Sequence, residues 1–243
     1  MGLELAHVAG AIAQVGVCIL GGESVELTSM IPYLSAEAPS GFLAGNLPRP
    51  LRNGTRPAVE CIENRRFSHS FSSEAPTLEE IGQILWAGFG CTSHTTHSGD
   101  TGDPYRRQGK TIPSGNAVYD LVLYTLTEAG VAIYVNWDFD RSVPTHSLES
   151  VRKGMFIPTL LKCLPRVPEA SAYIVAASLG KFRRKSAVME AGYAGLNISL
   201  QAEALGLGCH ISALTPEETE AIQRGLSLRA PPTAVISIGY GKR

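Results

Sequence analysis

The chain has 243 residues, with 21 Lys and Arg against 22 Asp and Glu, and a formal net charge of -1 at pH 7. A charge so evenly balanced excludes a general attraction to nucleic acid or to an anionic membrane, so any basic site must be local. Hydrophobic residues make up 44% of the chain and charged residues 18%, which suits the core of one globular domain with or without an arm.

The cysteines are scattered, and none of them belongs to a Cys-x-x-Cys pair. They are Cys18, Cys61, Cys91, Cys163 and Cys209. An odd number without a regular framework argues against a secreted disulfide scaffold and favours reduced thiols. We therefore expect a cytoplasmic protein in which most cysteines are small buried apolar residues.

Residues 3–20 are the one candidate for a targeting or membrane segment. The run lacks a basic start, Glu4 and His7 interrupt it, and it is too short for a membrane span. We expect instead a helix that packs on protein and ends at Gly21-Gly22.

Residues 31–59 contain several prolines and glycines. Such a stretch cannot hold a long helix and predicts an extended connector. We therefore divide the chain into an N-terminal helical arm over 1–58 and a main domain over 59–243.

The main domain begins with a short helix, roughly 58–65. Thr77 and Glu80 then form a capping box at the start of a second helix. Its apolar positions fall at helical spacing and are Leu78, Ile81, Ile84, Leu85 and Phe89. Residues 91–110 are polar and rich in glycine, which predicts a long loop.

Four apolar runs predict strands over 118–126, 130–139, 171–179 and 233–241, with a helical segment between the second and the third. A helix is expected over 186–205, and Thr215 with Glu218 begins another. This order predicts an α+β domain with one mixed sheet flanked by helices.

Arg65 and Arg66 are adjacent, so both cannot point into a core. They indicate either a solvated face or a phosphate clamp, because guanidinium groups match phosphate oxygens. Residues 111–117 place a hydroxyl, a flexible backbone and an amide just before a strand. These groups suit hydrogen bonds to a planar ring or a ribityl chain, and an ordinary turn is the alternative.

The helix 186–205 carries a stripe of small residues, which indicates close approach by another helix. The stripe consists of Ala187, Ala191, Ala194 and Gly195. We interpret it as part of a homodimer interface, which Ala191→Trp should split, although a core helix would look similar. The glycines of residues 206–208 would let backbone N–H groups reach a planar ligand.

Four motifs follow one another in a characteristic order. They read Arg65-Arg66-x-Ser68-x-x-Phe71, Pro113-Ser114-Gly115-Asn116-Ala117, Glu190-Ala191-Gly192-x-Ala194-x-x-Asn197 and Ala204-Leu205-Gly206-Leu207-Gly208. In this order they resemble the FMN-dependent nitroreductase family over roughly residues 59–243. Within that family, residues 113–120 are similar to the Pro-Ser-Ala-Gly-Ala-Leu-Tyr-Pro segment of the azoline-oxidising dehydrogenases of peptide maturation.

The resemblance implies an FMN site shared between two identical subunits. It implies cofactor-binding roles for Arg65, Arg66, Ser68, Pro113, Ser114, Gly115, Asn116, Ile211, Ser212, Ala213, Lys242 and Arg243. The arginines and the residues after the last strand would hold the phosphate, and the backbone of 211–213 would face flavin N5. Ser114 and Asn116 would border the flavin of the partner subunit.

The chain departs from the family pattern at several positions. Phe67 stands where a small hydroxyl residue is usual, and His69 stands where a further basic residue is usual. The missing charge is then expected from Arg106, Arg107 or Lys110. The catalytic Lys-Tyr pair of azoline dehydrogenases is matched by Lys181 and Phe182, so a lysine base is expected without the phenol.

The spacing of Cys91, His94 and His97 would suit a metal, but the stretch reads as a loop and zinc usually takes a fourth ligand. We expect no metal there and a polar wall near the flavin instead.

The resulting hypothesis is an FMN-dependent oxidoreductase that transfers hydride through flavin N5. NAD(P)H would be the donor, and a nitroaromatic, a quinone or another flat electrophile the acceptor. Two alternatives stay open: an azoline-type dehydrogenase that acts on a peptide, and a flavin-binding protein without its own turnover.

Overall fold

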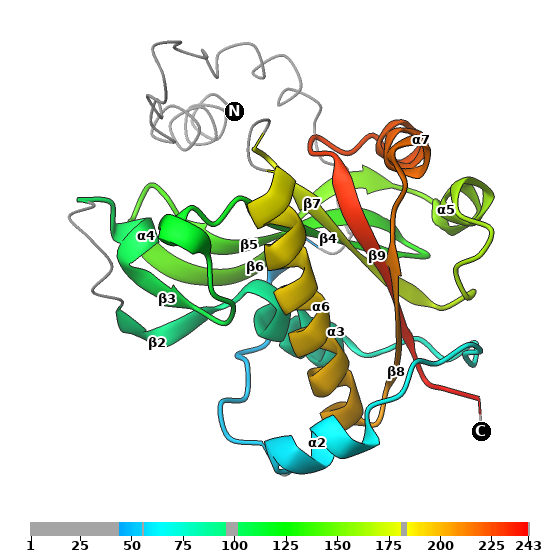
Figure 1. Cartoon of the computed structure of the whole chain (residues 1–243), viewed down its shortest axis with the longest axis horizontal. Helices are drawn as coiled ribbons and strands as arrows, with labels where there is room; N and C mark the ends of the chain where they lie inside the picture. The colour runs from blue at the N-terminus through cyan, green and yellow to red at the C-terminus, as the bar shows by residue number, and fades with distance from the viewer. Residues whose placement is uncertain (1–43, 55, 96–101, 181–183, 243) are drawn as a thin grey trace.

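A computed structural model describes residues 44–242 apart from 55, 96–101 and 181–183 (Figure 1). The side chains of residues 116, 184 and 185 are also outside the description. The helix expected over 3–20, and the proposed site residues Lys181 and Arg243, lie outside the described residues. Among the residues that are described, no helix is both long and apolar enough to cross a bilayer.

A seven-stranded sheet forms the centre of the domain, in the order β1-β6-β5-β4-β7-β9-β8. Its strands are β1 (Gly45–Asn46), β4 (Leu121–Thr127), β5 (Gly130–Asp138), β6 (Val143–Lys153), β7 (Ala172–Ser178), β8 (Gly208–Ala213) and β9 (Pro232–Gly239). Every pairing within this sheet is antiparallel, so the expectation of a mixed sheet is corrected in this respect.

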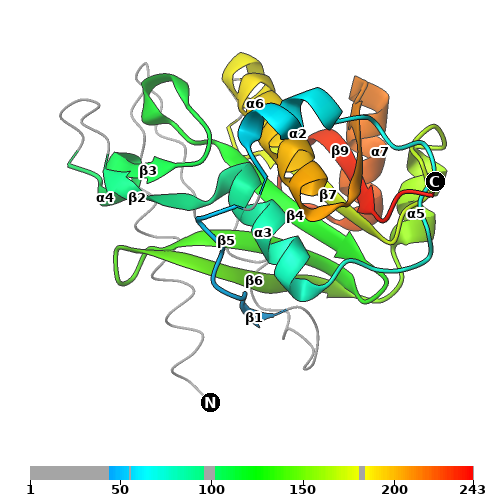
Figure 2. The same ribbon diagram turned by 90° about the horizontal axis from the view of Figure 1, so that it is seen from below.

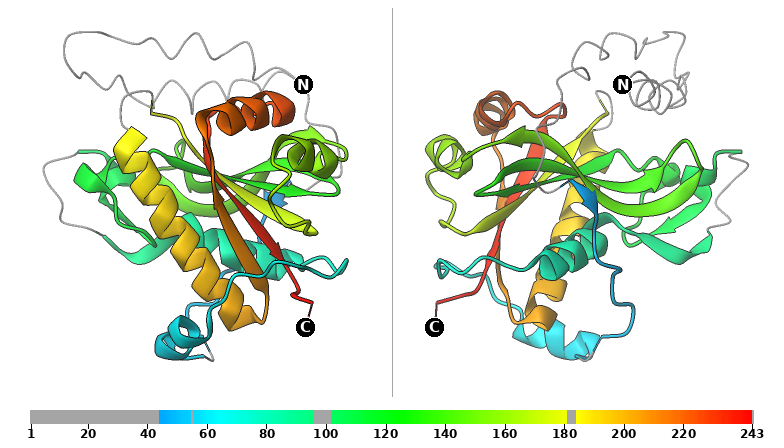
Figure 3. Two further views of the ribbon diagram at one scale, coloured as in Figure 1. Left: turned by 45° about the vertical axis from the view of Figure 1, so that its right-hand side comes forward. Right: turned by 180° about the vertical axis from the view of Figure 1, so that it is seen from behind.

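Helices cover both faces of the sheet (Figure 3). On one face α3 (Leu78–Phe89) and α6 (Arg184–Leu205) enclose a core that includes Ile84, Ile198 and Leu123. On the other face α5 (Ile157–Cys163) and α7 (Pro216–Leu226) enclose a second core that includes Leu160, Ile222 and Tyr124. Adjacent residues of one strand, such as Leu123 and Tyr124, enter opposite cores because side chains alternate along a strand. Figure 2 shows α3 and α6 on the same side of the sheet.

The starts of two helices are determined locally by capping boxes, as the sequence predicts. At α3 the Glu80 amide donates to Thr77 Oγ1 over 3.2 Å, and the Thr77 amide donates to Glu80 Oε2 over 2.7 Å. At α7, Thr215 and Glu218 make the same reciprocal pair. Each box satisfies two amides that the first turn of a helix leaves without a partner.

The polar stretch 91–110 contains regular structure where a loop was expected. Its elements are β2 (Cys91–Thr95), α4 (Pro104–Arg107) and β3 (Gln108–Lys110), with β2 antiparallel to β3. Lys110 stabilises this unit, because its buried ammonium lies 4.0 Å from the ring centre of Tyr105 and donates to the carbonyls of Tyr105 and Gln108. Tyr105 in turn packs on Trp137 of β5.

The small residues of α6 face the protomer's own core. Ala187, Ala191 and Ala194 are 1%, 5% and 0% exposed, and a side chain at Gly195 would meet Ile211 of β8. The expectation that this stripe faces a partner helix is therefore wrong. Its residues let the helix lie close to the sheet, and Ala191→Trp would disrupt the core.

The opposite face of α6 is exposed and carries large apolar side chains. These are Val188, Met189, Tyr193 and Leu196, with exposed fractions of 58%, 56%, 37% and 50%. We call these four residues the outer face of α6. Single apolar residues scattered over a surface are normal, whereas four on one face of a helix are typical of an interaction surface.

Candidate functional site

Three segments that are far apart in the sequence meet at one edge of the sheet. The Ser68 amide donates to the Cys209 carbonyl of β8 over 2.9 Å, and the Lys242 amide donates to the Ser70 carbonyl over 3.2 Å. Phe71 forms an antiparallel bridge with Gly241. The segment 67–72 therefore lies between β8 and the residues that follow β9, as Figure 1 shows near the C-terminal end.

Gly208 allows this close approach. A Cβ atom at Gly208 would overlap the Ser68 hydroxyl and would lie 2.9 Å from Ser68 Cβ. A Cβ atom at Gly241 would lie 3.6 Å from the Ser68 hydroxyl. The side chain of Ser68, a predicted cofactor contact, is thus turned toward the backbone of Gly208 and Gly241.

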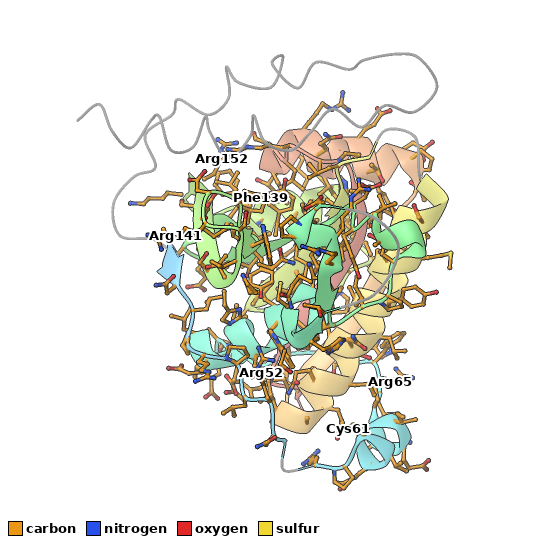
Figure 4. The ribbon with its side chains drawn as sticks, turned by 90° about the vertical axis from the view of Figure 1, so that its left-hand side faces the viewer. Arg52, Cys61, Arg65, Phe139, Arg141 and Arg152 are labelled. Carbon is orange, nitrogen blue, oxygen red and sulfur yellow. The ribbon has the colours of Figure 1, made fainter. Side chains whose placement is uncertain are left out.

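The structure distinguishes the two adjacent arginines. Arg66 donates to the carbonyls of Glu63 and Arg65 over 2.7 and 2.9 Å, so its guanidinium stabilises the end of α2 (Ala58–Asn64). Arg65 lies over the Phe67 ring at 5.4 Å and is half-buried. Figure 4 labels Arg65 close to α2. Burial raises the pKa of the Cys209 thiol to about 12, and the nearby Arg65 charge opposes this shift. Arg65 therefore faces β8 and is the better candidate for an anion contact.

Two histidines extend the contacts of Arg65 and Phe67. We call Arg65, His69 and His210 the basic cluster. The ring centres of His69 and His210 are 5.1 Å apart, and the Phe67 ring centre lies 5.4 Å from that of His210. The pKa of His210 is lowered by burial and further by the neighbouring His69. The sequence indicated His69 only as a departure from a pattern, and no sequence signal singled out His210.

β8 is the last strand of the sheet, so one of its edges faces away from β9. We call this edge the β8 edge. The Cys209 carbonyl points to that open edge, because it accepts from the Ser68 amide. Backbone groups alternate in direction along an antiparallel strand, so Ile211 and Ala213 point the same way and Ser212 points toward β9. Two of the three residues predicted to face a flavin edge thus present outward amides.

The predicted segment 113–116 lies at the other half of α6 and is arranged around Glu190. Ser114 donates its hydroxyl to Glu190 Oε1 over 2.5 Å and accepts from the Tyr119 amide over 3.0 Å. The Leu121 amide donates to Glu190 Oε2 over 3.2 Å. Pro113 and Gly115 are exposed. The hydroxyl of Ser114 is therefore engaged inside the protomer. The sequence singled out Glu190 only as part of a motif and did not predict that it binds Ser114.

Glu190 is buried, and the backbone of the segment that it holds is strained at two positions. Glu190 is 1% exposed, and burial raises the pKa of its carboxyl group while the Ser114 hydrogen bond opposes the rise. Ala117 and Tyr119 both adopt positive φ angles, of 52° and 53°. Non-glycine residues in this conformation store strain and concentrate at functional sites.

The other candidates from the sequence lie elsewhere. The Cys91 thiol donates to the Asn136 carbonyl, and His94 pairs with Thr92, whereas His97 is outside the described residues. Within the described part of the chain, no group of three metal-ligating residues occurs. Arg106 pairs with Asp103, and Lys110 is committed to the carbonyls beside it, so this lysine does not join the basic cluster.

A cavity of about 360 Å³ opens on a different part of the surface, between α3 and β6. Its lining includes Arg52, Trp86 and His146, and none of the predicted site residues contributes to it. Arg52 lies over the Trp86 ring, and burial lowers the pKa of His146 to about 4. The residues of the β8 edge do not line this cavity.

The chain matches the model of a known protein family. The model described as the nitroreductase family matches residues 62–240. A solved structure from Ralstonia eutropha JMP134, described as a nitroreductase, has a TM-score of 0.66 and 19% identity, and the alignment covers 83% of this chain and 91% of that chain. No curated protein matches the sequence.

Two further structures add descriptions of chemistry. A Bacteroides thetaiotaomicron protein described as an NADH dehydrogenase/NAD(P)H nitroreductase has a TM-score of 0.53 and 18% identity, with 76% of this chain and 87% of that chain covered. A Desulfovibrio desulfuricans protein described as a nitroreductase in complex with FMN has a TM-score of 0.50 and 17% identity, with 77% and 88% covered.

Proposed function

Because the chain belongs to the nitroreductase family, whose members are FMN-dependent oxidoreductases, we propose that it binds FMN at the β8 edge and catalyses two-electron transfer. The observation that carries this proposal is the meeting of segment 67–72, β8 and the residues after β9. That meeting places Arg65, the Lys242 backbone and the outward amides of β8 along one edge of the sheet.

The residues at this edge fit the cofactor. Arg65 and Lys242, together with Arg243 outside the described residues, supply positive charge for a terminal phosphate, and a partly desolvated phosphate requires such charge. The outward amides of Ile211 and Ala213 would donate hydrogen bonds to the flavin ring edge and orient it. When bound, FMN supplies hydride transfer through its N5 atom, and the protein supplies position and electrostatics.

The proposed donor is NAD(P)H, and the proposed acceptor is a flat electrophile such as a nitroaromatic or a quinone. The description of the Bacteroides thetaiotaomicron protein supports a nicotinamide donor. Donor and acceptor would use the same open face in turn, which gives ping-pong kinetics. Lys181, which matches the lysine of the Lys-Tyr pair in the azoline-dehydrogenase resemblance, is proposed as a proton-transferring residue.

An azoline-type dehydrogenase is the alternative, and it is supported by the segment Pro113–Tyr119, whose backbone is strained at two positions. Phe182 in place of a tyrosine weakens this alternative. A bound FMN that NAD(P)H does not bleach would favour this alternative, or flavin binding without turnover, over the reductase. We also propose a cytoplasmic location, which the free thiols of Cys61, Cys91, Cys163 and Cys209 support.

The test is the absorption spectrum of the purified full chain under anaerobic conditions. We expect a flavin spectrum, FMN as the flavin released by heat, and bleaching of the bound flavin when NADH or NADPH is added. Recovery of absorbance on addition of a quinone completes the expected cycle. Absence of flavin after reconstitution contradicts the proposed cofactor, and a bound FMN that neither nicotinamide bleaches contradicts the proposed donor.

We further propose that the protein is a homodimer that packs through the outer face of α6. A free apolar helix face of this kind needs a partner surface. Glu190, which holds the Ser114 segment, and Leu205, where α6 ends near the basic cluster, are separated by about 22 Å along the helix. This separation supports a site in which the partner subunit contributes the Ser114 segment.

Leu196→Glu tests the dimer, because it places a charge on the outer face. We expect the dimer to weaken at least tenfold and flavin to be released in parallel, since an interfacial charge without a partner is costly to desolvate. Val143→Glu, an exposed apolar position on β6, is the matched control. Light scattering and flavin fluorescence are measured on one sample. A monomeric Leu196→Glu protein with wild-type FMN affinity would show that the site is not shared.

A further inference from the structure

The side chains at the β8 edge form a continuous series of contacts. Arg65 lies 5.4 Å from the Phe67 ring centre, and the Phe67 ring lies 5.4 Å from that of His210. His69 completes the series at 5.1 Å from His210, with a steep angle of 70° between the two rings. His69 is exposed and His210 is half-buried, so a ligand at this edge can reach both.

The groups around the two imidazoles are mainly cationic. Arg65 precedes segment 67–72, which contains His69, and the Lys242 amide after β9 donates to the Ser70 carbonyl. Arg166, beside α5, also acts on His210, and it is paired with Glu218 of α7 over 2.8 Å. The Cys209 thiol stays protonated, since burial raises its pKa to about 12. Among these described neighbours, the one carboxylate is Glu218, and Arg166 neutralises it.

We propose that His69 and His210 are the proton-accepting part of the FMN phosphate site, so that the cofactor binds more tightly as the pH falls toward 6.5. This inference rests on the proposed function. It assigns to two histidines a pH-dependent part of the positive charge at this edge, to which Lys110 does not contribute. Phosphate-binding sites built from arginine and lysine alone keep a constant charge in this pH range, whereas imidazoles titrate within it.

The sign of the effect follows from the neighbours. Without an anion, burial lowers the pKa of His210, and the charges of His69 and Arg166 lower it further. A dianionic phosphate within reach of the two rings favours their protonated forms. Binding then takes up protons, so affinity is gained as the pH falls toward 6.5.

The experiment is a fluorescence titration of the full-length apoprotein with FMN at pH 8.0, 7.2 and 6.5. Riboflavin, which lacks the phosphate, is titrated in parallel. The range stays above the second phosphate pKa of about 6, so FMN keeps most of its charge. We expect FMN affinity to rise at least about threefold over this range and riboflavin affinity to stay constant.

Variants locate the titrating groups. His69→Arg should bind FMN tightly with a reduced pH dependence, because it places a fixed charge at that position. The double change of His69→Gln with His210→Gln should weaken binding at pH 6.5 and remove the pH dependence. Arg65→Ala should weaken binding at every pH, by roughly 10-fold to 100-fold for one charge-assisted contact, and keep the slope. His94→Ala, at an exposed histidine elsewhere, should match the wild type.

The outcomes separate this inference from the proposed function. No FMN binding at any pH would overturn the proposed function itself. FMN binding that is independent of pH, or a riboflavin affinity with the same slope as that of FMN, would overturn the role of the histidines alone. A slope that persists in the double histidine variant would do the same.

Discussion

Gly208→Ala is expected to remove FMN binding and to lower the free energy of unfolding by about 2 kcal/mol, as overpacking does. The added Cβ would overlap the Ser68 hydroxyl and approach Ser68 Cβ to 2.9 Å and Phe71 Cε1 to 3.1 Å. Rotation of the Ser68 side chain cannot relieve the contact with Ser68 Cβ. The segment 67–72 must therefore move away from β8.

That movement would separate Arg65 from the β8 edge, so we expect FMN affinity to fall by at least tenfold. The measurements are urea unfolding of the apoprotein and a flavin titration. Gly102→Ala is the matched control, because a Cβ there meets nothing within 4 Å. Wild-type FMN affinity in Gly208→Ala would contradict the placement of the site.

Glu190→Ala is expected to lower the free energy of unfolding by about 3 kcal/mol. Hydrogen bonds to a charged group contribute about 1.5–3 kcal/mol each, and Glu190 accepts one from Ser114 and one from the Leu121 amide. The variant leaves both donors without their buried acceptor. The loss of unfolding free energy should be larger for Glu190→Ala than for Glu190→Gln, because glutamine keeps one carbonyl oxygen in place.

The measurement is urea unfolding with an unchanged m-value, combined with a double-mutant cycle between Glu190→Gln and Ser114→Ala. We expect a coupling energy of about 1 kcal/mol or more between these two contacting side chains. Glu203→Ala supplies the control on the same helix, because the exposed Glu203–Arg56 ion pair should contribute less than about 1 kcal/mol. Additive effects of the Glu190 and Ser114 changes would show that their contact carries no energy of its own.

Elements with local signals were predictable from the sequence. The capping boxes at Thr77 and Thr215 determine where α3 and α7 begin, and the apolar run of β9 indicates a central strand. β6 was missed because it is half-exposed and largely polar. β8 was missed because its six residues include a glycine and a histidine and follow directly on a helix. The hairpin of β2 and β3 depends on the burial of Lys110 among aromatic rings, which only the folded chain brings together.

The site was predictable in its residue types and less so in its geometry. The sequence indicated Arg65 and the backbone of 211–213, but it contained no sign that segment 67–72 lies between β8 and the residues after β9. Both faces of α6 are apolar, so residue size alone did not reveal that the small residues face inward. Ser114 was predicted to contact the flavin, whereas its hydroxyl is bound to a carboxylate 76 positions away in the sequence.

The long sequence separation between segment 67–72 and the residues after β9 has a consequence for biosynthesis. The Lys242 amide reaches the Ser70 carbonyl only after β7, α6, β8, α7 and β9 have all been added. Contacts between such distant positions form late, because the cost of closing the intervening chain comes first. A nascent chain on the ribosome would lack the basic edge until synthesis of the domain was nearly complete. Cofactor capture would then be one of the last events in its maturation.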